Sequence, residues 1–88
     1  MYKFTAKLDV SNFRKLPQIV VVEPWANDYT LLPGEELVIV AFDDRQVPWF
    51  HVREWDGTTQ VYVQVGADFK VWQGKNELQC GHNRQTEA

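Results

Sequence analysis

Apolar and polar residues alternate along much of this chain with the period of two that is typical of half-buried β-strands. The alternation is clearest between Pro48 and Val65, where the pair Asp56-Gly57 separates two such segments. Asp-Gly is a preferred loop of a two-residue β-hairpin, because both residues of its type I′ turn need a positive φ angle. The pattern therefore predicts a hairpin that turns at Asp56-Gly57.

A turn at this position determines which side chains of the hairpin share a face. One face collects apolar residues that we expect in the core: Phe50, Val52, Val61 and Val63. The other face collects mainly aromatic and polar residues: Trp49, His51, Arg53, Trp55, Gln60, Tyr62 and Gln64. Because a shift of one residue would mix the two sets, their separation supports this register.

Similar segments on both sides of the hairpin predict further strands, at residues 2–10, 18–24, 29–32, 36–42, 69–73 and 77–80. Proline, glycine, asparagine and aspartate separate them, as turns require. In the connection from Ser11 to Pro17, we expect Phe13 and Leu16 to pack against the core. The sequence thus predicts an all-β fold, either a small antiparallel β-sandwich or a partly open barrel of seven to eight short strands, with no significant helix.

Length and composition indicate one domain. A chain of 88 residues, 44% of them hydrophobic, can bury a small core. We expect a single β domain over residues 1–80 and a frayed C-terminal tail over residues 81–88. The net charge of −3 disfavours nucleic acid as a partner, because phosphate contacts need clustered Lys and Arg. Since no apolar run is long enough for a signal peptide or a membrane span, we expect a cytoplasmic protein with no membrane partner.

Few side chains offer catalytic or metal-binding chemistry. Cys80, His51 and His82 are too few for a structural zinc site, which takes four such ligands. Ser11 lies in no nucleophile elbow, and Cys80 and His82 would lie about 7 Å apart on a strand, beyond hydrogen-bond reach. Carboxylates in the predicted loops are interpreted as solvated charge. We therefore expect no enzyme activity, no cofactor and no metal.

The stretch from Val22 to Ala41, VEPWANDYTLLPGEELVIVA, resembles a motif of small uncharacterised bacterial β proteins. The residues that match the motif are Glu23, Pro24, Trp25, Tyr29, Leu31, Pro33, Gly34 and Glu35. The resemblance covers about a quarter of the chain and implies a bacterial β protein without implying an activity. The Pro-Gly-Glu corner is also similar to that of cupin-type jelly rolls. A metal-binding cupin is excluded, however, because the chain lacks the His-x-His pair of the cupin metal site.

The aromatic side of the hairpin is the candidate binding site. Its predicted binding residues are Trp49, His51, Arg53, Trp55, Gln60 and Tyr62. Protein interfaces favour Trp, Tyr and Arg, so the best prediction is a non-catalytic module that binds a protein partner or forms a homodimer. The alternative is a carbohydrate-binding module in which Trp49, Trp55 and Tyr62 stack against sugar rings. A third interpretation is that a terminal segment covers this face and makes it a second small core.

Overall fold

The computed structural model describes residues 2–84. Its strands are β1 (Phe4–Ser11), β2 (Gln18–Glu23), β3 (Asn27–Leu31), β4 (Glu36–Asp43), β5 (Trp49–Trp55), β6 (Thr58–Gln64), β7 (Asp68–Gln73) and β8 (Asn76–Leu78). The predicted all-β class and the predicted number of strands are confirmed. No helix that could cross a membrane occurs within the described range.

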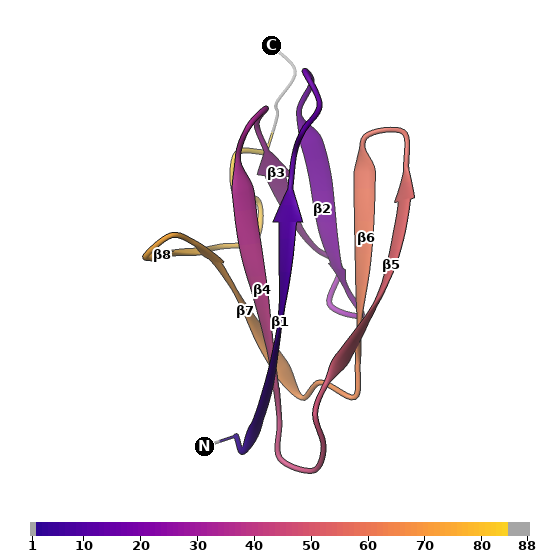
Figure 1. The fold of residues 1–88 in the computed structure, drawn as a ribbon, viewed down its shortest axis with the longest axis vertical. Helices are drawn as coiled ribbons and strands as arrows, with labels where there is room; N and C mark the ends of the chain where they lie inside the picture. Colours follow the sequence, from indigo (N-terminus) through magenta and orange to yellow (C-terminus); the bar gives the residue numbers. More distant parts are fainter. Residues whose placement is uncertain (1, 85–88) are drawn as a thin grey trace.

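The strands form two four-stranded sheets, ordered β1-β4-β7-β8 and β3-β2-β6-β5 (Figure 1). Each sheet keeps two edge strands of its own, so the architecture is a β-sandwich and not a closed barrel. Among the described strands, neighbours are antiparallel except for β2 and β6, which run parallel. This parallel pair places β2 beside the predicted hairpin of β5 and β6, although the two segments are far apart in the sequence.

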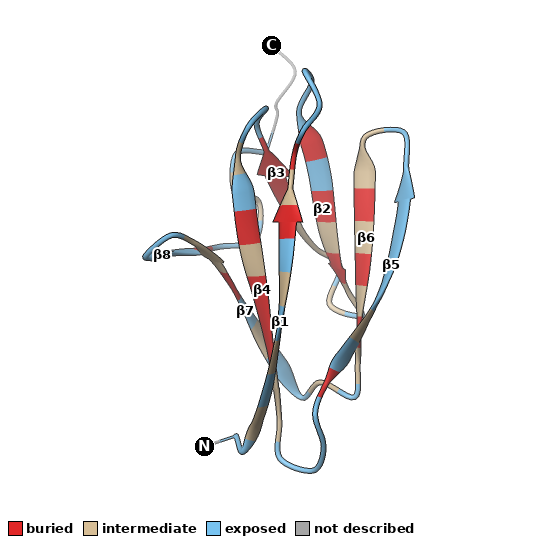
Figure 2. Ribbon diagram, in the orientation of Figure 1, coloured by how far each residue is buried: buried red, intermediate tan, exposed pale blue. Residues whose placement is uncertain are grey.

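The core lies between the sheets and is built from the alternating apolar residues of both. Along β2 and β6, every second residue is buried and the residues between them are more exposed, which Figure 2 shows as bands on both strands. The central strands contribute Val20, Val22, Leu37, Ile39, Ala41, Val61 and Val63 to the core. The hydrophobic pattern that predicts the strands therefore also predicts their inner faces.

The hairpin of β5 and β6 has the predicted turn and register. Asp56 and Gly57 have φ angles of 30° and 85°, and Trp55 lies opposite Thr58 across the turn. Six further pairs follow outward, ending with Trp49 opposite Gln64. Because these pairs agree with the separation of apolar and aromatic residues, the prediction of two distinct hairpin faces is confirmed.

The loop between β1 and β2 differs from the prediction, because Phe13 and Leu16 do not pack against the core. Their exposed fractions are 93% and 61%. The interior position near this loop is taken by Asn12, which is fully buried. Its Nδ2 donates hydrogen bonds of 2.9 Å to the carbonyl oxygens of Leu16 and Leu31. The loop is thus held by a buried amide, while its two apolar side chains face solvent.

The first residues of the predicted C-terminal tail are hydrogen-bonded to β3. The amide of Gly81 donates to the carbonyl of Asp28 at 2.7 Å, and the amide of Thr30 donates to the carbonyl of His82 at 2.8 Å. Arg84 forms a salt bridge with Asp28. Residues 81–84 therefore lie along the outer edge of β3, where the sequence predicts fraying. Residues 85–88 of the predicted tail lie outside the described range.

Candidate interaction face

The predicted binding residues all lie on the outer surface of the sheet β3-β2-β6-β5. We call this surface the hairpin face, and it consists of Trp49, His51, Arg53, Trp55, Gln60, Tyr62 and Gln64. Cross-strand pairing places His51 opposite Tyr62 and Arg53 opposite Gln60. Trp49 and Trp55 lie at the two ends of β5, six residues apart, which corresponds to about 20 Å along a strand. The hairpin face is therefore a strip with a polar middle and a tryptophan at each end.

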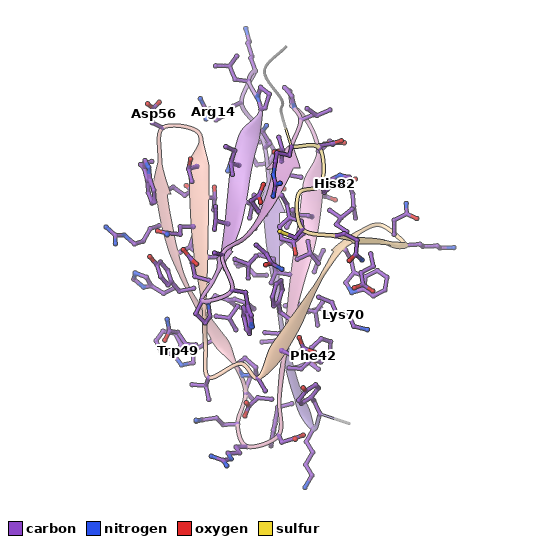
Figure 3. The ribbon with its side chains drawn as sticks, turned by 180° about the vertical axis from the view of Figure 1, so that it is seen from behind. Arg14, Phe42, Trp49, Asp56, Lys70 and His82 are labelled. Carbon is purple, nitrogen blue, oxygen red and sulfur yellow. The ribbon has the colours of Figure 1, made fainter. Side chains whose placement is uncertain are left out.

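The two tryptophans of the hairpin face are largely accessible to solvent. Trp49 is 56% exposed and Trp55 is 50% exposed. His51 and Arg53 are also exposed, whereas Gln60 is half-buried. Figure 3 shows Trp49 on the outside of the hairpin, at the end opposite to Asp56 and the turn. The third interpretation needs the N- or C-terminal segment as a cover. Within residues 2–84, Tyr2 stacks on Phe42 of the opposite sheet and residues 81–84 lie on β3, so neither end of the described chain covers this face.

Contacts within the sheet hold the β6 side chains of the hairpin face in place. The Nε2 atom of Gln60 donates a hydrogen bond of 2.9 Å to Oε2 of Glu23 on the parallel strand β2. The rings of His51 and Tyr62 lie side by side, with centroids 6.1 Å apart and planes inclined by 55°. The side chains of β6 are thus oriented by their neighbours, while those of β5 have neighbours on one side only.

Val52 is the one residue of the predicted inner face that is largely exposed. It lies opposite the fully buried Val61, but 41% of its surface is accessible. The cause is the position of β5, which is the edge strand of its sheet (Figure 1). In Figure 2, β5 is exposed along nearly its whole length. The prediction that Val52 belongs to the core is therefore wrong in burial, although the side chain faces the predicted side.

The outer face of the opposite sheet also carries apolar residues, but charged side chains flank them. Val40 lies between Lys7 of β1 and Lys70 of β7 in the strand register. The aliphatic stems of lysines cover apolar neighbours while their amines stay in water, which accounts for the low exposure of Val40. Trp49 and Trp55 have no such cover, so the two faces of the sandwich differ in accessible aromatic surface.

An open groove of about 540 Å³ lies at the turn end of the hairpin, beside Trp55. Its floor contains a chain of hydrogen bonds, in which Gln18 donates to Thr59 and Thr59 donates to Oε1 of Glu54 at 3.3 Å. Phe13 and Arg14 from the β1–β2 loop line its other side. Of the groove residues named here, only Trp55 belongs to the predicted site. Phe13 and Arg14 could not be predicted as its neighbours, because the approach of their loop to the turn leaves no local pattern in the sequence.

The sheet also brings residues of β2, which are not among the predicted binding residues, next to the hairpin face. Ile19 lies beside Thr58, and Val21 lies beside Gln60. Ile19 is one of the exposed large apolar residues of the chain. No sequence signal identifies these neighbours, since a parallel pairing between distant strands has no local turn to announce it.

The titratable groups whose pKa values differ from normal lie at β3, away from the hairpin face. A hydrogen bond from Arg84 lowers the pKa of Asp28, and burial raises the pKa of Tyr29. The Sγ atom of Cys80 also donates to Oδ1 of Asp28 at 3.7 Å. In the part of the chain that the structure describes, no group of three or more His, Cys, Asp or Glu side chains is arranged to hold a metal ion.

The chain matches no protein-family model, no curated protein and no solved structure. The likeness of residues 22–41 to bacterial β proteins and the bacterial origin that it implies therefore stay predictions.

Proposed function

We propose that this chain is a non-catalytic module that binds another protein through the hairpin face. The observation that carries this proposal is the exposure of Trp49 and Trp55 on the same side of one edge strand. Fully burying a large apolar side chain contributes about 1.5–3 kcal/mol. A small domain that leaves two tryptophans in water does not gain this free energy when it folds. A partner that covers the two rings gains it on binding.

The residues between the tryptophans support a protein as the partner. Arg53 and His51 offer hydrogen-bond donors next to the exposed rings, and Tyr62 adds a ring with a hydroxyl group. Trp, Tyr and Arg are the residues that most often contribute large binding energies in protein interfaces. Apolar anchors at both ends with polar groups between them also match the mixed composition of such interfaces.

The composition of the hairpin face supports a binding role over catalysis. The face contains no Ser, no Cys and no pair of carboxylates, so it offers neither a nucleophile with its base nor an acid–base pair. Its exposed aromatic rings support one other candidate, which is carbohydrate binding by stacking on Trp49, Trp55 and Tyr62. Both candidates use the same surface and differ in the ligand that covers it.

Affinity capture with matched variants tests the proposal. Tagged wild-type chain, the double variant Trp49→Ala/Trp55→Ala and the control Tyr2→Ala are used to capture proteins from a lysate of the source cells. Tyr2 is also an exposed aromatic residue, but it stacks on Phe42 of the opposite sheet. We expect a protein that the wild type and the control retain and the double variant loses. If the same proteins bind all three, the proposal is wrong.

A further inference from the structure

The edges of the two sheets differ in how they are protected. The edge of β3 is covered by residues 81–84, and the edge strand β8 is only three residues long. The edge strand β1 directs Thr5, Lys7 and Asp9 outward, and charged side chains of this kind discourage pairing with another strand. The edge strand β5 is seven residues long and also carries two charged residues, Arg53 and Glu54. Unlike β1, however, it leaves apolar side chains exposed, which are Trp49, Val52 and Trp55. Among the described strands, β5 is therefore the edge best suited to accept another strand.

The backbone groups that β5 presents to a further strand follow from the pairing of β6. The amide of Ile19 donates to the carbonyl of Gly57 at 2.9 Å, so Gly57 and every second residue after it direct their backbone groups toward β2. The residues between them, beginning with Thr58, direct theirs toward β5. Their partners in the register are Trp49, His51, Arg53 and Trp55. The amide and carbonyl groups of Phe50, Val52 and Glu54 consequently point away from β6, at the free edge.

We propose that two copies of the chain associate by pairing their β5 strands antiparallel, with His51 facing His51 of the second copy. The inference rests on the proposed function, since it names a second copy of the chain as the protein that binds beside the hairpin face, along the free edge of β5. In this arrangement Phe50 of each copy exchanges backbone hydrogen bonds with Val52 of the other. The two four-stranded sheets join into one continuous sheet, and the two hairpin faces become one surface.

The side chains of β5 suit this register. Centred on His51, it places Phe50 opposite Val52 on the inner side, twice, and so covers the exposed part of Val52 with an apolar partner. On the outer side, Arg53 lies opposite Trp49 of the second copy, where the guanidinium can stack on the indole. No two like charges within β5 then face each other directly.

The two registers centred further along β5 are less favourable. A register centred on Val52 places Glu54 opposite Phe50 on the inner side, where the carboxylate loses water without gaining a donor. A register centred on Arg53 places two guanidinium groups directly opposite each other, which is destabilising. Pairing centred on His51 avoids both costs and keeps Trp49 to Arg53 within the shared ladder.

A proline at the free edge tests the pairing. Val52→Pro removes an amide that points toward the second copy and that β6 does not use. Thr5→Pro is the matched control. The Asn12 amide donates to the Glu35 carbonyl, so Asn12 and every second residue before it in β1 direct their backbone groups toward β4. Thr5 lies between these residues, and its amide therefore points away from β4. Sedimentation velocity up to about 1 mM measures the monomer–dimer equilibrium. We expect a dimer for wild type and Thr5→Pro, and a dissociation constant at least roughly tenfold higher for Val52→Pro.

Cysteine pairing tests the register and does not depend on the stability of the proline variant. In the background Cys80→Ser, His51→Cys places two Cα atoms about 4.5 Å apart in the proposed dimer, which a disulfide can span. Arg53→Cys is the control, because its two cysteines would lie about 14 Å apart. With oxidised glutathione, we expect a disulfide-linked dimer for His51→Cys and none for Arg53→Cys.

The outcomes separate this inference from the proposed function. A wild-type chain that stays monomeric, a Val52→Pro variant that dimerises like wild type, or equal cross-linking of the two cysteine variants overturns the edge pairing. Each of these results leaves the capture experiment unaffected, because that experiment compares Trp49→Ala/Trp55→Ala with Tyr2→Ala. Conversely, a captured protein set that does not depend on the tryptophans removes the proposed function, while the backbone pairing of β5 is still decided by sedimentation.

Discussion

Arg14 lies across Gly57, with its Nη1 atom 2.6 Å from the point that a β-carbon on Gly57 would occupy. This contact joins the β1–β2 loop to the turn that sets the register of the hairpin. In Figure 3, Arg14 and Asp56 are seen at the same end of the molecule. The glycine is thus required for its positive φ angle and is also approached closely by a neighbouring side chain.

Substitution of Gly57 separates these two effects. We expect Gly57→Ala to lower the free energy of unfolding by about 1–2 kcal/mol, because a β-carbon is strained at positive φ. Gly34→Ala is the control, since Gly34 has φ +84° against +85° for Gly57 and has open space around it. We expect nearly equal losses in urea unfolding, because the guanidinium of Arg14 can swing aside. A much larger loss for Gly57→Ala would show that the Arg14 contact is rigid.

The exposure of Val52 predicts a contrast with its partner Val61. Val61→Ala removes buried methyl groups and should cost about 2 kcal/mol of unfolding free energy. Val52→Ala should cost about 0.5 kcal/mol or less, as is usual for exposed positions. Both are measured by urea unfolding at low protein concentration. Equal losses would mean that Val52 is covered within one copy of the chain.

The salt bridge between Arg84 and Asp28 predicts a pH dependence at the edge of β3. The hydrogen bond from Arg84 lowers the pKa of Asp28 from its ordinary value of 3.8. Because the pKa is lower in the folded chain, the interaction stabilises the fold above pH 3.8 and is lost as the pH falls through the lowered value. We expect Arg84→Gln to raise the pKa of Asp28 in an NMR titration.

The control for this titration is Arg45→Gln in the exposed β4–β5 loop, which should leave the pKa of Asp28 unchanged. The effect on stability should be small, because 59% of the Arg84 side chain is exposed. An unchanged pKa in Arg84→Gln would mean that residues 81–84 do not hold this position along β3 in solution.

Glycan titration distinguishes the two candidate ligands of the hairpin face. For a protein-binding module, we expect no saturable change in tryptophan fluorescence across a broad panel of oligosaccharides. A saturable change that Trp49→Ala/Trp55→Ala abolishes and Tyr2→Ala preserves would instead establish the sugar-stacking alternative.

Local sequence patterns predict the hairpin, whereas contacts between distant segments are not predictable from them. Asp56-Gly57 predicts the register because a two-residue turn determines every pair that follows it. The parallel pairing of β2 with β6 has no such turn, so the proximity of Ile19 to the hairpin face has no signal in the sequence. Val52 is exposed because β5 is an edge strand, and period-two alternation predicts the direction of a side chain but not whether a neighbouring strand covers it.

Polar side chains account for the other differences. Hydrophobicity predicts that Phe13 and Leu16 are buried, but the amide of Asn12 satisfies the carbonyls of Leu16 and Leu31 and holds the loop with its apolar residues outward. A polar sequence predicts fraying after Cys80, but backbone bonds to Asp28 and Thr30 add residues 81–84 to the edge of β3. Such bonds depend on geometry and not on composition, so neither arrangement is visible in the hydrophobic pattern.

Oxidative footprinting tests the central claim most directly. The tagged chain is exposed to hydroxyl radicals once as purified protein at low concentration and once in a lysate of the source cells, and the oxidation of each aromatic residue is measured by mass spectrometry. If a cellular protein covers the hairpin face, Trp49 and Trp55 are protected in the lysate while Tyr2 is oxidised equally in both. If both tryptophans are oxidised to the same extent in the lysate as in the purified protein, the hairpin face is not a binding surface.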